Sequence, residues 1–562
     1  MTLNEQTKNT IKKITDDALA LSKEKGELVF DSLPEYLIEE PREKEFGDFS
    51  VNVAMLLAKQ ARRAPRDIAN IILANMKTDG TYVNEVSVAG AGFINFKLDP
   101  VYITKIIEMV ETEGEKFGAT SFGEGKKINV EFVSANPTGP MHIGNARGGA
   151  MGDCLANILK LAGFCATKEF YVNDAGNQIE KLAVSLMARY KQLVLGEDAY
   201  EFPEDGYHGE DVKEHAKCFY EKHGDSMVNT PDEELKKALI DETLYKNIAG
   251  LKTGLEAYGI NYDVWFHEST LHNENAVLET VDELTKRGYT YEKEGAIWFK
   301  ATDFGLEKDD VLVRANGFVT YFAADIAYHK NKFDRGFDTA IDIWGADHHG
   351  HVARLKAAME ALGINPDRLE VILMQLVRLV RDGEAVRMSK RTGKAITLDD
   401  LLEEIGIDAA RFFFNMRNAG SHFDFDLDLA VEQSNNNPVF YVQYAHARIC
   451  SIIRLLSESG KIVKSAAEIN KNLLSNETEF NLLRQIAELP DEIKAAAETL
   501  EPSKLTRYSI ELANAFHSFY NECHVNVEDE GLLHARLKLI DSARVALANV
   551  LELLKVEAPE KM

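Results

Sequence analysis

Residues 128–172 constrain the fold most, because they read as a strand, a turn, a helix and a second strand in direct succession. Residues 128–133 are apolar and β-prone, a turn rich in proline and glycine follows, and the next helical pattern stops at Gly163. Residues 166–172 then resume the strand pattern. Two strands joined through one helix form a βαβ unit with parallel strands, and such sheets bind nucleotides in a crevice at their strand ends.

The chain has 562 residues, which suggests three or four domains of roughly 150 residues each. We expect a small α/β domain at 1–115, a Rossmann-type parallel-sheet catalytic domain at 116–407 and an α-helical bundle at 408–562. Residues 190–298 are irregular and rich in helical patterns, so we interpret them as an inserted subdomain. Asn437-Pro438 is a helix start, with asparagine as the cap and proline in the first turn.

Shorter elements follow from local patterns. The sequence predicts helices at 51–59 and 68–76, one alternating strand at 83–96, a linker at 111–127, and further buried strands at 339–344 and 370–375. From Asp408 onward the pattern is helical. The whole chain is thus expected to be an α/β protein with an added helical bundle.

Composition restricts the possible partners. No stretch approaches the ~20 apolar residues that span a bilayer, and the polar first 25 residues carry no secretory signal, so we expect a cytoplasmic protein without a membrane partner. Five scattered cysteines with no Cys-x-x-Cys pair fit reduced thiols. The net charge of −27 opposes general binding of nucleic acid, although residues 376–394 are locally basic.

The first motif that carries chemistry is SANPTGPMHIGNAR, residues 134–147, at the junction of the first strand and the helix. The free N–H groups of a helix N-terminus bind phosphate. Gly144 allows a bulky ligand to approach the backbone, and His142 can donate to phosphate oxygens as charge develops. A plain turn with a buried histidine remains an alternative for this segment alone.

The second motif is VRMSKRTG, residues 386–393, about 245 residues further on. One lysine among arginines, small hydroxyls and a glycine suits a loop that closes over the β- and γ-phosphates of ATP. A solvated basic loop is the alternative. The two motifs together are much harder to explain by chance than either alone.

The two motifs give the chain its resemblance to class I aminoacyl-tRNA synthetases. Residues 142–145, HIGN, resemble the His-Ile-Gly-His signature, and residues 387–391, RMSKR, resemble the Lys-Met-Ser-Lys-Ser loop. The surrounding blocks are similar to the arginyl-tRNA synthetase family over nearly the whole chain; they are EFGDFSVNVA (45–54), VEFVSANPTGPMHIGNARG (130–148), YVNDAGNQ (171–178), WGADHHGH (344–351), DFDLDLAVEQSNNNPVFYVQYAHARI (424–449) and LKVEAPEKM (554–562).

The resemblance implies activation of L-arginine by ATP and transfer of arginine to tRNA(Arg), with Mg²⁺ accompanying ATP and a monomer as the working form. His142, Asn145 and Lys390 would be the catalytic residues, and Gly144, Arg387, Met388 and Ser389 would also bind ATP. The substrate arginine would lie against Ser134, Asn136, Tyr321, Asp325 and Asp347, with Glu131 as a weaker candidate. The helical bundle would bind the anticodon loop, and the N-terminal domain the outer corner of the tRNA.

Three residues differ from the family signatures, and the sequence leaves other functions open. Asn145 replaces the second histidine of the first signature, and Arg387 and Arg391 replace the outer residues of the second. The cluster DHHGH, 347–351, is crowded with histidine, but adjacent side chains diverge and the spacing does not resemble a zinc motif, so no dedicated metal site is expected. A synthetase for another amino acid, a nucleotidyltransferase and a non-catalytic tRNA-binding paralogue are the competing functions.

Overall fold

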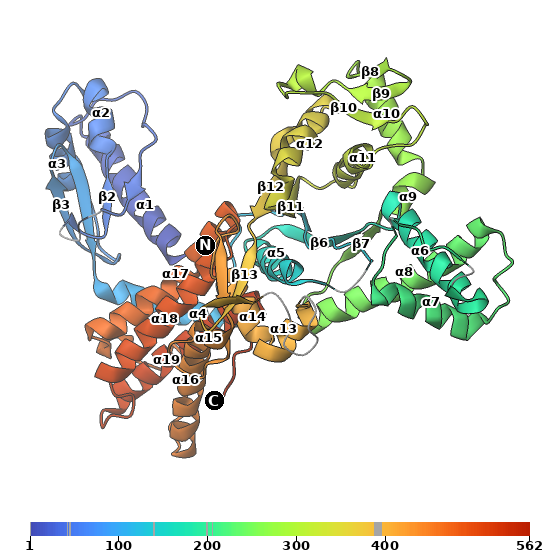
Figure 1. Ribbon diagram of the computed structural model, residues 1–562. Helices are drawn as coiled ribbons and strands as arrows, with labels where there is room; N and C mark the ends of the chain where they lie inside the picture. The colour runs from blue at the N-terminus through green and yellow to red at the C-terminus, as the bar shows by residue number, and fades with distance from the viewer. Residues whose placement is uncertain are drawn as a thin grey trace.

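A computed structural model describes residues 2–41, 43, 46–138, 141–197, 200–204, 206–386 and 396–562. An α/β domain lies at one side, a central parallel sheet carries two lobes at the other side, and a helical bundle lies below (Figure 1). Within the described residues, no helix combines the length and the apolar character needed to cross a membrane.

The N-terminal domain packs three helices, α1 (Leu3–Glu24), α2 (Val53–Ala61) and α3 (Pro65–Asn75), on an antiparallel sheet of order β1-β2-β4-β3. The strands are β1 (Ile38–Glu39), β2 (Phe49–Val51), β3 (Val83–Ala89) and β4 (Phe93–Leu98). The single strand predicted at 83–96 is therefore wrong: two strands form there. Gly90 and Gly92, with φ of 51° and 132°, turn the chain between them.

The segment between this domain and the sheet is short and fixed in place. It comprises the 3₁₀ turn η2 (Pro100–Thr104), α4 (Lys105–Glu113) and η3 (Gly114–Lys116). Phe117 is fully buried, and Asn549 of the bundle donates to the carbonyls of Gly114 and Phe117 at 2.9 and 3.0 Å. The predicted linker is thus held against the C-terminal bundle.

The central sheet is parallel, with the order β12-β11-β5-β6-β7. Its strands are β5 (Lys127–Glu131), β6 (Cys165–Val172), β7 (Val264–His267), β11 (Thr339–Gly345) and β12 (Leu369–Met374). The strand order reverses beside β5, so the crevice for a ligand lies at the carboxyl ends of β5 and β11. The predicted βαβ unit is confirmed, with α5 (Ile143–Leu161) as its helix. Segment 190–298 contributes β7 to this sheet.

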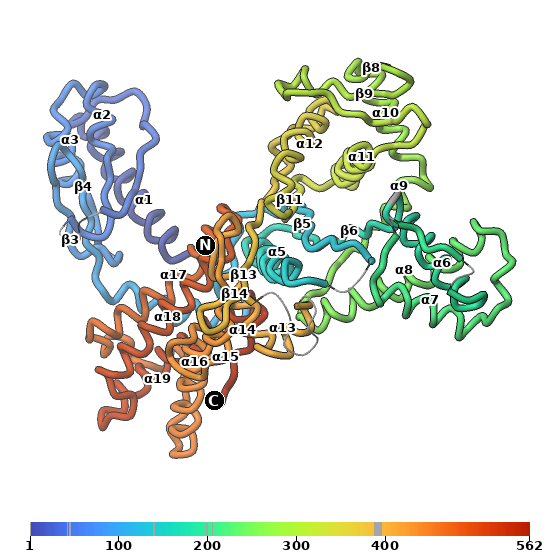
Figure 2. Tube along the Cα trace, in the orientation of Figure 1, coloured from blue at the N-terminus to red at the C-terminus, as the bar shows by residue number. Residues whose placement is uncertain are grey.

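Two lobes extend from the sheet (Figure 2). One consists of α6 (Asn177–Leu195), α7 (Glu210–His223) and α8 (Asp232–Ala257), which share a separate core. The other contains α9 (Glu268–Asn273), α10 (Ala276–Lys286), α11 (Tyr321–Asp334) and α12 (His349–Ala361), the sheet β10-β9-β8, and the turns η5 (Ala301–Phe304), η6 (Ala346–His348) and η7 (Pro366–Arg368). Its strands are β8 (Thr290–Lys293), β9 (Ala296–Phe299) and β10 (Asp310–Val313).

A three-stranded sheet, β14-β13-β15, connects the catalytic sheet to the bundle. It contains β13 (Val377–Arg381), β14 (Glu384–Val386) and β15 (Phe423–Asp426), with α13 (Leu398–Ile405), α14 (Ile407–Asn415) and α15 (Leu427–Val431) beside it. The prediction of helices throughout from Asp408 onward is therefore wrong at β15, because this strand completes its hydrogen bonds with the distant β13, which local periodicity cannot reveal.

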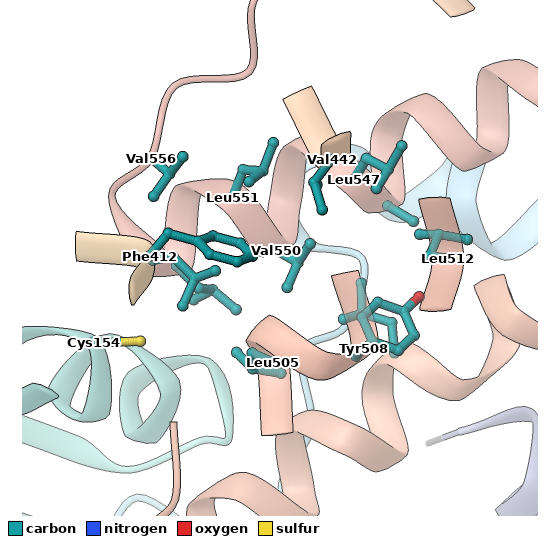
Figure 3. Close-up of a cluster of buried hydrophobic side chains, with 14 of the residues drawn as sticks. Cys154, Phe412, Val442, Leu505, Tyr508, Leu512, Leu547, Val550, Leu551 and Val556 are labelled. Carbon is teal, nitrogen blue, oxygen red and sulfur yellow. The ribbon is translucent and has the colours of Figure 1, made fainter. Parts of the chain in front are cut away.

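The bundle comprises α16 (Pro438–Glu458), α17 (Glu477–Thr499), α18 (Ser503–Glu522) and α19 (Glu530–Leu554), with η8 (Lys471–Leu473) between the first two. The predicted start of α16 is confirmed, since the Asn437 side chain accepts the N–H of Val439. Figure 3 shows Cys154 of α5 facing Phe412, Leu505 and Val550 in one buried cluster. Because the bundle shares this core with the catalytic helix, the two parts form one continuous body.

Candidate active site

The N-terminus of α5 lies at the predicted phosphate-binding turn. His142 is the exposed N-cap residue, and its backbone N–H donates to Oδ1 of Asn145 at 3.0 Å. A Cβ added to Gly144 would point into open space, so the helix end is uncovered at this position. The first turn of α5 therefore presents backbone N–H groups to a ligand, as a phosphate site requires.

A pocket of about 1140 Å³ opens in front of this helix end, between α5 and the β13-β14-β15 sheet. Its lining includes His142, Gly144, Val377, Val386 and Ile396. Val386 is the first residue of the second motif and Ile396 lies three residues beyond its last, so the described residues on both sides of the motif border the pocket. Arg387, Met388, Ser389 and Lys390 lie outside the described residues, as does Pro140.

The chain leaving the second motif is fixed to the chain entering the first. Leu398 donates its backbone N–H to the carbonyl of Met141 at 3.0 Å, and His142 and Thr397 form an isolated antiparallel bridge. Residues just beyond the second motif thus lie beside the helix N-terminus of the first, although the two motifs are about 245 residues apart in the sequence.

A second pocket, of about 1070 Å³, lies at the carboxyl ends of the parallel strands beneath α11 and α12. Five of the six residues predicted for the substrate line it, namely Glu131, Ser134, Tyr321, Asp325 and Asp347. Asn136 does not: it is exposed, and its Nδ2 donates to Gln178 of α6 at 2.9 Å. Tyr321 and Asp325 lie one turn apart on α11, as the sequence predicts.

The connection from β5 to α5 joins the two pockets. Val133 and Ser134 have left-handed backbone angles, with φ of 68° and 40°, which is strained for a β-branched residue such as valine. This kink directs the Ser134 hydroxyl to Glu131, to which it donates at 2.8 Å, while it accepts the N–H of Tyr171 at 3.1 Å. The strained backbone therefore lies in the lining of the second pocket.

Asp325 is held between two histidines, His329 and His351. His329 directs Nδ1 to Asp325 and Nε2 to Asp342, at 3.1 and 2.7 Å, so both ring nitrogens face acceptors and both carry hydrogens. Burial alone would lower the pKa of His329, but the charges of Asp325 and Asp342 raise it to about 10. Burial favours a higher pKa for Asp325, but the charge and hydrogen bonds of His329 lower it, so Asp325 is ionised.

His351 contacts the other oxygen of Asp325 through its Nε2. Its Nδ1 lies 2.9 Å from Nη2 of Arg354, and a guanidinium nitrogen only donates, so Nδ1 accepts. With Nδ1 accepting from Arg354, Nε2 of His351 donates to Asp325. Arg354 is fixed in turn by Asp310 at 2.8 Å.

A buried layer of ion pairs lies behind Asp325. Lys332 places Nζ 2.6 Å from both Glu131 and Asp342. Glu131, His329 and Asp342 are close enough to hold a metal ion, but the ammonium group of Lys332 already supplies a cation to both carboxylates. Their arrangement therefore does not fit a further metal. The exposed pair Asp347 and His348, 3.7 Å apart, forms no part of this layer.

Several residues of the site were not predicted. Glu268 and Tyr171 line the substrate pocket, and His329, Lys332 and Asp342 form the layer behind it. The spacing of Asp325, His329 and Lys332 places them on one helical face, which is a signal present in the sequence. Their partners on the strands lie up to 201 residues away and could not be paired with them from one sequence.

A parallel sheet with an uncovered helix N-terminus at its switch point, two pockets and a helical bundle is the architecture of the class I aminoacyl-tRNA synthetases. Three sequence profiles match: "Arginyl tRNA synthetase N terminal domain" at 2–98, "tRNA synthetases class I (R), catalytic domain" at 106–441 and "DALR anticodon binding domain" at 442–562. An arginine–tRNA ligase of Ruminiclostridium cellulolyticum is 57% identical over 561 residues, which cover 100% of both chains. The chain belongs to the arginyl-tRNA synthetase family.

Solved structures agree with this assignment. One from Campylobacter jejuni, assigned to the arginyl-tRNA synthetases, is 36% identical, covers 83% of this chain and 100% of its own, and has a TM-score of 0.75. The arginyl-tRNA synthetase of Thermus thermophilus is 22% identical, with a TM-score of 0.71 over 98% of this chain and 100% of its own. The second likeness supports the fold alone.

Proposed function

We propose that this chain activates L-arginine with ATP to arginyl-adenylate and then transfers arginine to the 3′ end of tRNA(Arg). Family membership supports this reaction. The structural observation that supports it best is the pairing of two pockets by the β5–α5 connection, one at a helix N-terminus and one beside ionised Asp325. An anionic nucleotide and a cationic amino acid would meet along that connection.

The arginine side chain fits the pocket beneath α11. The Asp325 carboxylate offers two oxygens to a planar guanidinium, which is the geometry of a bidentate pair. Tyr321 lies one helical turn away and is 48% exposed, so its ring is accessible to the ligand. Ser134 and Asp347, at the carboxyl ends of the strands, are proposed to contact the α-amino and carboxylate groups of arginine. Asn136 is proposed to contact them only if its side chain breaks the hydrogen bond to Gln178.

ATP fits the pocket in front of α5. The backbone of Gly144 and the side chain of His142 are proposed to contact the phosphates, and Lys390 to stabilise the departing pyrophosphate, together with Arg387, Met388 and Ser389. Among the described lining residues, the carboxylate of Asp424 already pairs with Arg378. We therefore propose that Mg²⁺ is held mainly by phosphate oxygens and water.

The chemistry needs no protein nucleophile. An oxygen of the arginine carboxylate attacks the α-phosphorus of ATP, the bond to the β-phosphate oxygen breaks, and pyrophosphate leaves. A terminal hydroxyl of the tRNA then attacks the carbonyl carbon of the adenylate, and AMP leaves. The protein contributes positioning and electrostatic stabilisation of the developing charge.

The bundle offers a surface for tRNA. Arg448 lies over the rings of Tyr444 and Tyr520, with its guanidinium carbon 5.2 and 4.4 Å from their centroids, whereas Tyr508 and Phe516 are core residues. Partly exposed tyrosines beside an arginine suit the stacking of unpaired anticodon bases. The N-terminal domain is proposed to contact the outer corner of the tRNA. Because one chain lines both pockets, we propose that the protein works as a monomer. We also propose that it acts in the cytoplasm.

A charging assay with defined products tests the proposal. Purified protein is incubated with ATP, Mg²⁺, tRNA(Arg) and each of the twenty amino acids in labelled form, and the nucleotide products are separated and identified. We expect AMP and pyrophosphate as products and label on tRNA only with arginine. Formation of ADP, or charging with another amino acid, would contradict the proposal, and a Lys390→Ala variant should form the adenylate more slowly while still binding tRNA.

A further inference from the structure

Three carboxylates form a row across the central sheet. Asp342 of β11 pairs in register with Glu131 of β5, which pairs in register with Glu169 of β6. Residues in register on neighbouring strands share a face, at a strand spacing of ~4.8 Å. All three side chains are buried, with at most 7% of each residue exposed. Such a row is unfavourable unless cations face it.

The cations come from a single face of α11. His329 contacts Asp342 at 2.7 Å, Lys332 contacts Glu131 and Asp342 at 2.6 Å, and Arg335 binds both oxygens of Glu169 at 2.6 and 2.8 Å. These three residues are spaced by three along the helix, so they form a row of cations that faces the row of carboxylates on the strands. The same helix carries Tyr321 and Asp325 one turn or more before the cations.

Asp325 extends this layer to the substrate pocket. One oxygen of its carboxylate lies 3.1 Å from Nδ1 of His329, and its other oxygen contacts Nε2 of His351. Glu131 and Asp325 both line the pocket, so the layer opens into it at this end. Burial, the main influence, raises the pKa of Glu131, and the charge of Lys332 opposes this rise. Loss of a cation from the row would therefore favour protonation of the carboxylates.

We propose that His329, Lys332 and Arg335 are positioning residues for arginine selection, which hold the row of carboxylates in place and fix Asp325 at the pocket for the substrate guanidinium. This inference rests on the proposed function. The ligand class that pairs with Asp325 held in this way is a monocationic alkylguanidinium. A neutral ureido isostere such as citrulline has no charge to pair with this carboxylate, so its similar shape alone does not give it access.

The main test uses His329→Gln, with Lys330→Gln as a matched control. Lys330 lies on the same helix, but it pairs with Asp334 and Glu283 and contacts none of the row. In the variant, Asp342 and Asp325 lose a cation, so protonation of the carboxylates becomes easier and guanidinium binding weaker. We expect KM for arginine to rise about tenfold or more, with KM for ATP and kcat changing by less than about threefold.

The pH profile separates positioning from a structural role. The groups that face His329 are Asp325, Lys332 and Tyr328 on α11, Asp342 on β11, and Glu131 on β5. Raising the pH from 7 to 9 should lower KM for arginine in His329→Gln as the carboxylates ionise again, whereas the parent and Lys330→Gln should change little. An unchanged KM with only a lower melting temperature would overturn the proposal.

A second pair of variants decides the question if His329→Gln does not fold. The Arg335 side chain is 28% exposed and binds only at the Glu169 end of the row, so its loss is easier to accommodate. Arg335→Gln should raise KM for arginine, and Arg335→Lys should restore most of it. No rise in Arg335→Gln would overturn the proposal. Failure of the proposed function is distinguishable, because the parent itself would then not charge tRNA with arginine.

Discussion

Oδ1 of Asn145 accepts the backbone N–H of His142 at 3.0 Å, and so closes the first turn of α5. Asn145 stands where the signature of the class has its second histidine. In this chain Asn145 therefore fixes the helix end that we propose as the phosphate site. Asparagine in place of histidine keeps a hydrogen-bonding side chain at this position, but that side chain cannot be protonated.

Asn145→Ala should slow adenylate formation by roughly 5- to 30-fold, because loss of a capping group costs about 1 kcal/mol or more at the phosphate-binding turn. Affinity for tRNA should be nearly unchanged. Single-turnover activation and tRNA binding are the measurements. Asn437→Ala, which removes the cap of α16, is the control and should affect stability more than activation. Unchanged single-turnover activation in Asn145→Ala would remove the role assigned to Asn145.

Asp325→Asn should raise KM for arginine by about 10- to 150-fold, the range for loss of a charge-assisted hydrogen bond. KM for ATP should change little, because the nucleotide pocket has a separate lining. Steady-state charging at varied arginine and ATP gives both constants. Asp334→Asn, at the exposed end of the same helix, should behave as the parent; an equal effect of the two substitutions would argue against a contact with substrate.

Stability should depend on pH through His329, whose pKa is raised to about 10 by Asp325 and Asp342 although burial opposes it. A pKa raised above its unfolded value of about 6.5 gives stability that is complete below that value and is lost as pH rises towards 10. The melting temperature of the parent should therefore exceed that of His329→Gln by several degrees at pH 6, and the difference should shrink by pH 10. A constant difference would contradict the charged state of His329.

At acid pH, the stability of the fold depends on pH with the opposite sign. Burial would raise the pKa of Asp342, but the charge of Lys332 lowers it, followed by that of His329. A lowered carboxyl pKa gives stability that is present above about 3.9 and is lost as pH falls below it. The layer beneath the pocket should thus stabilise the fold most near neutral pH.

Arg411 connects three parts of the molecule. It donates to the carbonyls of Leu554 and Tyr258 at 2.8 and 3.0 Å and pairs with Asp153 at 2.5 Å. Arg411→Met should destabilise the protein by about 3–5 kcal/mol, because it leaves Asp153 buried with only Lys168 as its cation. Denaturant unfolding measures this effect. Arg484→Met, at an exposed pair with Glu477, should cost at most about 1 kcal/mol.

Much of the architecture could be predicted because its signals are local. The βαβ unit at 128–172 and the start of α16 depend on periodicity and capping within a few residues. The strand β15 could not be predicted, because its partner β13 is distant in the sequence. Similarly, the sequence predicts one strand at 83–96 where the structure has a hairpin, since alternation continues through the glycines that turn it.

In the site, too, features with local sequence signals could be predicted and features that depend on distant partners could not. Motif resemblance indicated five residues that line the substrate pocket, and the structure brings them together. Asn136 was grouped with them by position in the motif, but its side chain is directed to Gln178. The charge layer of Glu131, Asp342 and Lys332 depends on strand register and helix packing, and neither follows from residue spacing along one chain.

Arginine-dependent exchange of pyrophosphate into ATP tests the central claim most directly. The parent protein is assayed with each amino acid, with and without tRNA(Arg), at fixed Mg²⁺. We predict exchange with arginine alone, and only when tRNA is present. Exchange with another amino acid, or with arginine in the absence of tRNA, would contradict this account.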